Sequence, residues 1–82
     1  MKHASHPKIT ARLKRAHGHL ASILTMLDDD RSCVDVAQQL HAVENAISNA
    51  KRELVNDHIE HCLDEMQRVD AVNEFKALSK YL

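Results

Sequence analysis

The stretch that decides the fold runs from Ser32 to Cys62 and reads SCVDVAQQLHAVENAISNAKRELVNDHIEHC. It contains neither glycine nor proline, and good helix formers such as Ala, Leu, Glu and Gln dominate it. Ser32 fits an N-cap, and Asp35 stands at the third helical position, as in a variant of the capping box. The stretch therefore predicts one long helix, about 45 Å from end to end at 1.5 Å per residue.

Apolar residues recur along this helix in steps that alternate between four and three, which is typical of a coiled-coil seam. The seam consists of Val36, Leu40, Val43, Ile47, Ala50 and Leu54. A rod of this length needs a packing partner along its whole length. The helix predicted before it is too short to supply all of that contact.

Two further helices are predicted on either side of the long one. The first runs from about Pro7, a favourable residue in a first turn, to about Leu27. Its apolar face consists of Ile9, Leu13, Ala16, Leu20, Ile23, Leu24 and Leu27. The acidic run 28–30 ends this helix, because acids at a C-terminus oppose the helix dipole. The third helix covers roughly 70–82, with an apolar stripe of Val72, Phe75, Leu78 and Leu82.

The composition supports an all-α protein that forms a single domain over residues 1–82. One glycine, one proline and two aromatic residues are too few for a sandwich or barrel. We find no apolar run that would span a membrane and no signal-peptide core, so we expect a cytoplasmic protein. Thiols stay reduced there, so Cys33 and Cys62 are expected to be ligands or reactive thiols rather than a disulfide.

The charge is distributed unevenly although the formal net charge is only −1. Residues 1–27 contain five basic residues and no acid, so all twelve acidic residues follow them. Lys8, Arg12, Arg15 and His19 recur on one face of the first helix. Such a face suits a polyanion such as DNA, and the alternative is an ordinary solvated helix surface.

A candidate metal site is divided between the two ends of the long helix. His58 and Cys62 are four residues apart, on one face and one turn apart. Cys33 lies 25 residues before His58, roughly 37 Å away along a helix, so the three cannot share a metal within one chain. If two copies pair antiparallel about a point near Ala46 and Ile47, Cys33 of one chain meets His58 and Cys62 of the other. A two-fold axis then creates two equivalent sites.

The donor set favours Cu(I) and leaves other metals open. Two thiolates and one imidazole suit Cu(I), which prefers soft ligands and accepts low coordination. Zinc more often recruits a fourth ligand, and His61, His3 or His6 could supply one. Zn(II), Ni(II) and Co(II) therefore stay open. The plain alternative is that these cysteines are small apolar side chains without any ligand role.

With these features, the sequence resembles the CsoR/RcnR/FrmR family of copper-sensing, nickel/cobalt-sensing and formaldehyde-sensing repressors. The resemblance covers nearly the whole chain and is densest in three stretches. They are 12–15 with 18–20, then 32–36 with Gln39, Ala42 and Val43, and finally 56–62. The set of Cys33, His58 and Cys62 is similar to that of the copper-sensing branch.

The resemblance implies a three-helix protomer, an antiparallel homodimer through the long helix with a core like a four-helix bundle, and a homotetramer as a dimer of dimers. It implies that the metal-free protein binds operator DNA and that metal releases it. The residues expected to contact DNA are Lys8, Arg12, Arg15, Lys51 and Arg52. Glu74 is similar to a third-helix carboxylate that holds the metal-bound histidine.

Two positions depart from the copper-sensing pattern: Ser32 stands where a tyrosine is frequent, and Asn49 stands where an arginine can occur. The leading hypothesis is a Cu(I)-responsive repressor, with Ni(II)/Co(II) sensing as the runner-up. Alternatives outside this class are a metal-buffering protein that does not bind DNA and a purely structural dimerisation module. An enzyme is not expected, because no nucleophile–base arrangement is visible.

Overall fold

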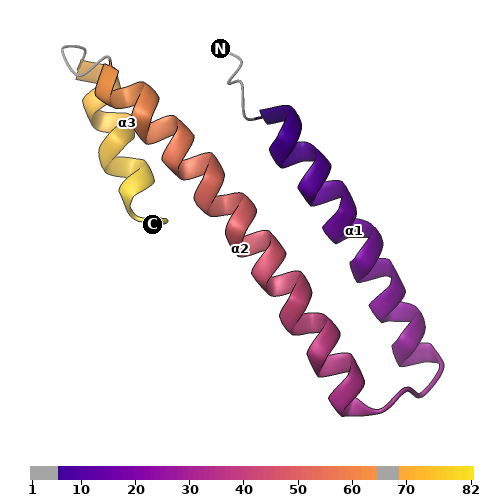
Figure 1. The fold of residues 1–82 in the computed structure, drawn as a ribbon. Coiled ribbons are helices and arrows are strands. Elements are labelled where there is room, and N and C mark those ends of the chain that lie inside the picture. The colour runs from indigo at the N-terminus through magenta and orange to yellow at the C-terminus, as the bar shows by residue number, and fades with distance from the viewer. Residues whose placement is uncertain (1–5, 65–68) are drawn as a thin grey trace.

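The computed structural model describes residues 6–64 and 69–82, with the side chains of 61–64 left out. Its helices are α1 (His6–Asp28), α2 (Cys33–Asp64) and α3 (Val69–Ser79). Helices α1 and α2 run antiparallel as a hairpin, and α3 folds back beside the C-terminal part of α2 (Figure 1). The predicted all-α architecture with a long central helix is confirmed. None of the described helices is long and apolar enough to cross a membrane.

The third helix is shorter than predicted. It ends at Ser79, and Leu82 lies beyond it as a largely exposed residue. The last residues form tight turns instead, because the N–H of Tyr81 bonds to the carbonyl of Leu78 and the N–H of Leu82 to that of Ser79. The prediction that Leu82 belongs to the apolar stripe of this helix is therefore wrong.

The turn between α1 and α2 is closed by backbone hydrogen bonds. Asp30 adopts a positive φ of 53°. Its N–H bonds to the carbonyl of Leu27 at 3.3 Å, and the N–H of Arg31 bonds to that of Met26 at 3.0 Å. This is the Schellman pattern, with aspartate at the position that usually holds glycine. At the start of α2, the N–H of Asp35 donates to Oγ of Ser32 at 3.1 Å, so the predicted N-cap is confirmed.

The predicted apolar seam of α2 is divided between two environments. Of the six seam residues, those buried within the protomer are spaced seven apart, namely Val36, Val43 and Ala50. The intervening residues Leu40, Ile47 and Leu54 are exposed, with Ile47 at 47%. A single neighbouring helix covers one line of side chains, so half of the seam stays outside the hairpin. This agrees with the expectation that the first helix cannot supply all of the contact that the seam requires.

The same division runs along α1. Ile9, Ala16 and Ile23 are buried, and Ile23 packs with Val36 and Val43. The leucines of the predicted apolar face are exposed instead, at Leu13, Leu20, Leu24 and Leu27. Each helix of the hairpin therefore carries a buried line and, beside it, a row of large apolar side chains without cover from the described chain.

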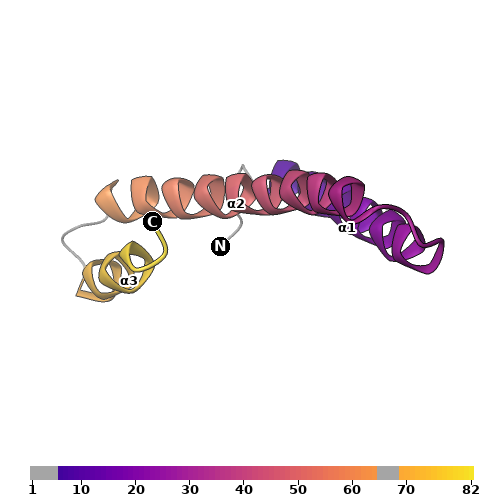
Figure 2. The same cartoon turned by 90° about the horizontal axis from the view of Figure 1, so that it is seen from below.

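The protomer is a single layer of helices. It measures 56 × 23 × 13 Å, and its smallest dimension is close to the 10–12 Å diameter of one helix. Its radius of gyration is 17.0 Å, whereas a compact chain of this length would have about 12 Å. Figure 2 shows the hairpin edge-on: α3 lies below the C-terminal part of α2, and α2 is the one described helix that contacts α1. Two helices side by side enclose only a narrow line of side chains, which explains why the two apolar rows remain exposed.

Candidate metal centre and nucleic-acid interface

Cys33 is the first residue of α2 and an exposed free thiol. It precedes Leu40, Ile47 and Leu54 by successive steps of seven residues. Because seven residues make nearly two full turns of a helix, Cys33 lies in line with this exposed row. A partner helix that covers the row would therefore also reach the thiol.

His58 lies one turn beyond Leu54, near the other end of the same row. Its side chain is 22% exposed, and its Nε2 pairs with Oε1 of Glu74 on α3. A carboxylate at one ring nitrogen fixes the tautomer and the orientation of a histidine. Glu74 therefore lies beside His58, the histidine that the resemblance assigned to it. Its role in metal binding stays a prediction.

The described residues do not bring a complete metal site together within one protomer. They contain no cluster of three or more His, Cys, Asp or Glu side chains suited to a metal ion. Cys33 and His58 lie at opposite ends of α2, as predicted. The side chains of Cys62 and His61, and all of His3, lie outside the described residues. His6 begins α1 and is partly buried, toward the end of the hairpin that carries His58.

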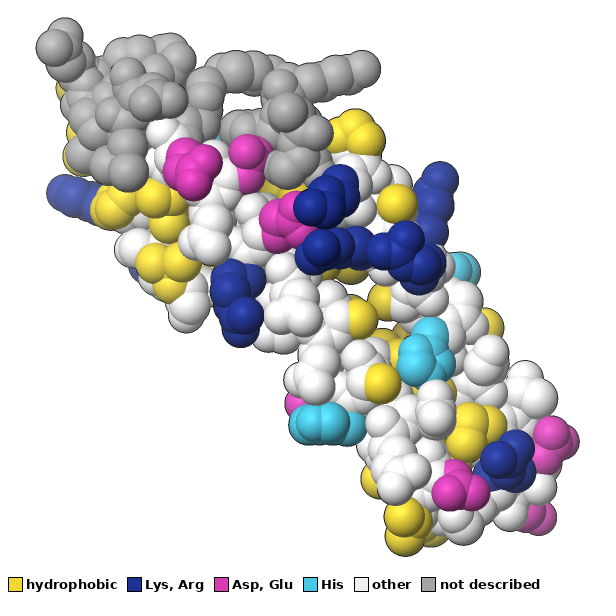
Figure 3. All heavy atoms as spheres, viewed as in Figure 1, with side chains coloured by type: hydrophobic (Ala, Val, Ile, Leu, Met, Phe, Trp, Pro, Cys, Tyr) yellow, Lys and Arg dark blue, Asp and Glu magenta, His cyan; other side chains and the backbone are white. Residues whose placement is uncertain are grey.

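Basic side chains gather where the N-terminal half of α1 lies beside α2 (Figure 3). Two of them are paired with one carboxylate. Nη1 of Arg12 lies 2.7 Å from Oε2 of Glu53, and Nζ of Lys8 lies 3.6 Å from Oε1 of the same residue. The predicted basic face of α1 is therefore partly neutralised by α2.

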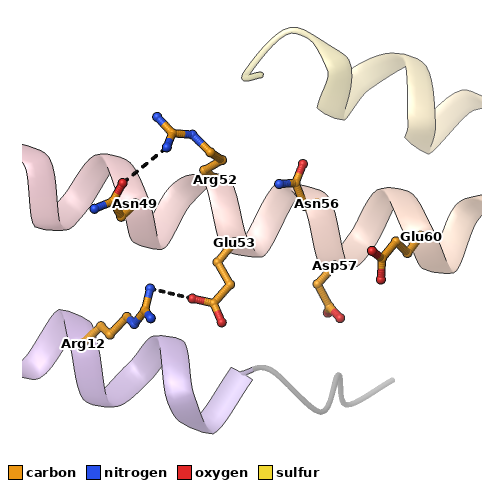
Figure 4. A pocket seen from close by; sticks show the side chains of 7 residues that line it. All are labelled: Arg12, Asn49, Arg52, Glu53, Asn56, Asp57 and Glu60. Atoms are coloured by element: carbon orange, nitrogen blue, oxygen red, sulfur yellow. Dashed lines mark hydrogen bonds and ion pairs between the residues drawn. The ribbon is translucent and has the colours of Figure 1, made fainter.

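Two adjoining hollows follow this flank of the hairpin, and Arg12 lines both. The first, drawn in Figure 4, is lined by Arg12, Asn49, Arg52, Glu53, Asn56, Asp57 and Glu60. The second is lined by Arg12, Arg15, Ala16, His19, Ala46 and Asn49. The first mixes cations with acids, whereas the lining of the second includes no acid. A polyanion therefore meets purely cationic and neutral groups only in the second hollow.

The structure brings most of the predicted DNA-contacting residues to this flank. Arg12 and Arg15 come from α1, and Arg52 comes from α2, where it donates to Oδ1 of Asn49 at 3.3 Å. Lys51 is exposed but is not among the side chains that line either hollow. Consecutive residues of a helix point about 100° apart, which separates Lys51 from Arg52.

Sequence reasoning missed Glu53 as a partner of the basic face, and it treated Asn49 only as a departure from a pattern. It also missed the bond across the hairpin between Nε2 of His19 and Oε1 of Gln39, 2.5 Å long. A usable signal was present: an antiparallel hairpin that turns at residues 29–32 places 8–12 roughly beside 49–53. That register was available once the turn had been identified.

The geometry defines a class of protein: a helical hairpin with a short third helix that exposes a row of apolar side chains between a thiol and an imidazole and carries basic side chains along one flank. The chain belongs to the family of metal-sensitive transcriptional repressors, whose family model matches residues 5–81. The CsoR-type resemblance drawn from the sequence is thereby confirmed. Members of this family are repressors, so the prediction that the chain is not an enzyme is confirmed as well.

The individual relatives differ in the metal to which their names say they respond. The chain is 47% identical over 51 residues to the copper-sensing transcriptional repressor CsoR of Mycobacterium ulcerans, and 43% identical over 56 residues to that of Bacillus subtilis. These segments are 62% and 68% of this chain, but 44% and 55% of the relatives. In three dimensions it is similar to the nickel-responsive transcriptional regulator InrS, with a TM-score of 0.84 at 26% identity, covering 100% of this chain and 98% of InrS.

Proposed function

We propose that this protein is a Cu(I)-responsive transcriptional repressor that acts on operator DNA in the cytoplasm. The observation that carries the proposal is the position of Cys33 and His58 at the two ends of the exposed row Leu40, Ile47 and Leu54. Family membership supports metal-responsive repression in general. The choice of copper and the assembly are parts of the proposal.

The exposed row is symmetric about Ile47. A two-fold axis through this residue also brings the proposed metal ligands of two chains together. Leu40 and Leu54 are each seven residues from Ile47. An antiparallel pair of α2 helices centred on Ile47 sets Leu40 against Leu54 of the partner subunit, which buries the row. The same pairing places Cys33 opposite residue 61 of the partner, within one turn of its His58 and Cys62. Apolar packing and metal binding thus require the same register.

The donors fit a soft metal. Thiolates of Cys33 and Cys62 with the imidazole of His58 form a three-ligand set of the kind that Cu(I) accepts. Glu74 would hold His58 from the side opposite the metal and connect the metal site to α3. Ni(II), Co(II) or Zn(II) would need a further donor, for which His61, His3 and His6 are the candidates.

DNA binding is assigned to the flank that holds Lys8, Arg12, Arg15 and Arg52, with Lys51 as a more distant contributor. Phosphate contacts of this kind are expected to make the affinity fall steeply with salt. If Cu(I) weakens DNA binding by some factor, DNA must weaken Cu(I) binding by the same factor. A metal buffer that does not bind DNA would need no such flank.

The proposal is tested by titrating reduced, metal-free protein with Cu(I) and separately with Ni(II) under anaerobic conditions. The readout is fluorescence anisotropy of labelled operator-containing DNA. We expect release at about one Cu(I) per protomer, and loss of this response in Cys33→Ala, because that variant removes one thiolate from each intersubunit site. Ser32→Ala is the neighbouring control, since it alters the helix cap and spares the thiol.

Other outcomes would contradict parts of the proposal. Release by Ni(II) or Co(II) but not by Cu(I) would move the protein to the nickel/cobalt-responsive branch. Tight metal binding without any DNA binding at low salt would favour the buffering alternative. Mixing Cys33→Ala with His58→Ala subunits tests the intersubunit site: a mixed dimer retains one intact site, whereas neither variant alone retains any.

A further inference from the structure

Glu53 is the carboxylate that bridges the two helices on the basic flank. Its side chain is 24% exposed, and its two oxygens contact different cations of α1, Arg12 and Lys8. Arg12 is 36% exposed and Lys8 is 65% exposed. Ion pairs this open to water are weak, so an incoming anion can displace the carboxylate.

The position of Arg12 between the two hollows gives this pair a consequence for DNA binding. On one side Arg12 meets Glu53, in a hollow also lined by Asp57 and Glu60. On the other side it lines the hollow with Arg15 and His19. A phosphate group that enters the second hollow competes with Glu53 for the same guanidinium. Lys8 lines neither hollow, but its ammonium contacts the other oxygen of Glu53, so a phosphate that reaches Lys8 also competes with this carboxylate.

We propose that Glu53 is an internal competitor of operator phosphates for Arg12 and Lys8, and that it thereby lowers the DNA affinity of the metal-free protein. The inference rests on the proposed function, because it requires that this flank binds DNA. Lys8, Arg12 and Glu53 together carry a net charge of about +1, whereas the two cations alone would carry +2. With the carboxylate present, fewer phosphates are therefore neutralised. The carboxylate thereby keeps the DNA affinity of the metal-free protein low enough that a modest further decrease on metal binding releases the DNA.

The test compares Glu53→Gln with the wild-type protein, both metal-free and reduced, on labelled operator-containing DNA over a series of salt concentrations. We expect about fivefold or tighter binding by Glu53→Gln at low salt. The plot of log affinity against log salt should become steeper by roughly 0.9 for each additional phosphate that the variant neutralises. Glu53→Asp, which retains the charge but has a shorter reach, should give a smaller increase and serves if Glu53→Gln does not fold.

Glu60→Gln is the matched control, because it removes the same charge from the same hollow, whereas the ion pairs of Arg12 and Lys8 in the described part of the chain are with Glu53. We expect it to change the affinity less than twofold. Equal increases in both variants would mean a general charge effect and would overturn the competition. If the wild-type protein binds DNA but Glu53→Gln binds it equally or more weakly, the competition by Glu53 would be overturned and the proposed function would stand. Absence of wild-type binding at low salt would instead refute the proposed function, and the inference with it.

Discussion

At the scale of single residues, His58 connects two parts of the molecule. Its ring belongs to α2, which carries the proposed ligands, and its Nε2 is held by Glu74 of α3. A metal bound by the ring would be supported by this carboxylate, which orients the histidine. If His58 binds the metal as proposed, this contact connects the occupancy of the site to the position of α3.

Replacing Glu74 with Gln tests this route. The amide keeps the size of the side chain but loses the negative charge that supports His58. We expect Cu(I) affinity to fall by roughly 10- to 100-fold, which is the usual cost of losing a carboxylate behind a metal-bound histidine. DNA release at saturating Cu(I) should be diminished, while the metal-free protein binds DNA normally. DNA binding and DNA release are both measured by fluorescence anisotropy, and Lys76→Gln, an exposed position of the same helix, is the control. Full release of DNA by Glu74→Gln would show that the response does not depend on the contact between α3 and His58.

At the scale of elements, the connection between α1 and α2 fixes the hairpin. Its Schellman closure requires a left-handed residue, and Asp30 occupies that position with a φ of 53°. Aspartate tolerates this conformation better than most residues, but glycine adopts it without steric cost. The Asp30 carboxylate also lies near the C-terminal end of α1, where the helix dipole disfavours an anion.

Asp30→Gly is therefore expected to stabilise the protein, by about 0.5–1 kcal/mol in the free energy of unfolding. Thermal unfolding followed by circular dichroism at one fixed protein concentration measures the difference, because oligomers unfold in a concentration-dependent way. Asp28→Gly is the control. Asp28 is the last residue of α1 and does not have a positive φ, so a glycine there removes the same charge without relieving backbone strain and should not stabilise the protein. A loss of stability in Asp30→Gly would contradict the assignment of strain to this residue.

At the scale of the whole molecule, the described hairpin leaves two rows of apolar side chains exposed, and in the proposed assembly a second copy covers them. The side chains buried in the described protomer are few, and Ala16, Ala50 and Ala71 are among them. Ile23 is the one large side chain that is fully buried there. Such a small core gives limited stability, whereas the exposed rows on α1 and α2 offer apolar area for a second copy.

Ile47→Lys places a charge at the centre of the proposed two-fold pairing, where it meets its own copy. We expect a shift from oligomer to monomer in analytical ultracentrifugation, together with a large loss of helix by circular dichroism. Val34→Lys is the matched control, because Val34 is an exposed apolar residue of the same helix but lies away from the row. An unchanged oligomer in Ile47→Lys would show that copies associate through another surface.

The sequence by itself determined the three helices, the Ser32 cap and the separation of Cys33 from His58, because these depend on local propensity and on the fixed rise of a helix. It could not divide the apolar residues into those buried in the hairpin, such as Val43, and those left outside, such as Ile47. Both sets follow the same periodicity, and only the side on which α1 packs distinguishes them. For Arg12 and Glu53, the turn identified from the sequence sets 8–12 roughly beside 49–53, but only the tertiary structure decides which of these side chains meet, because the rotation of each helix about its axis is fixed by packing.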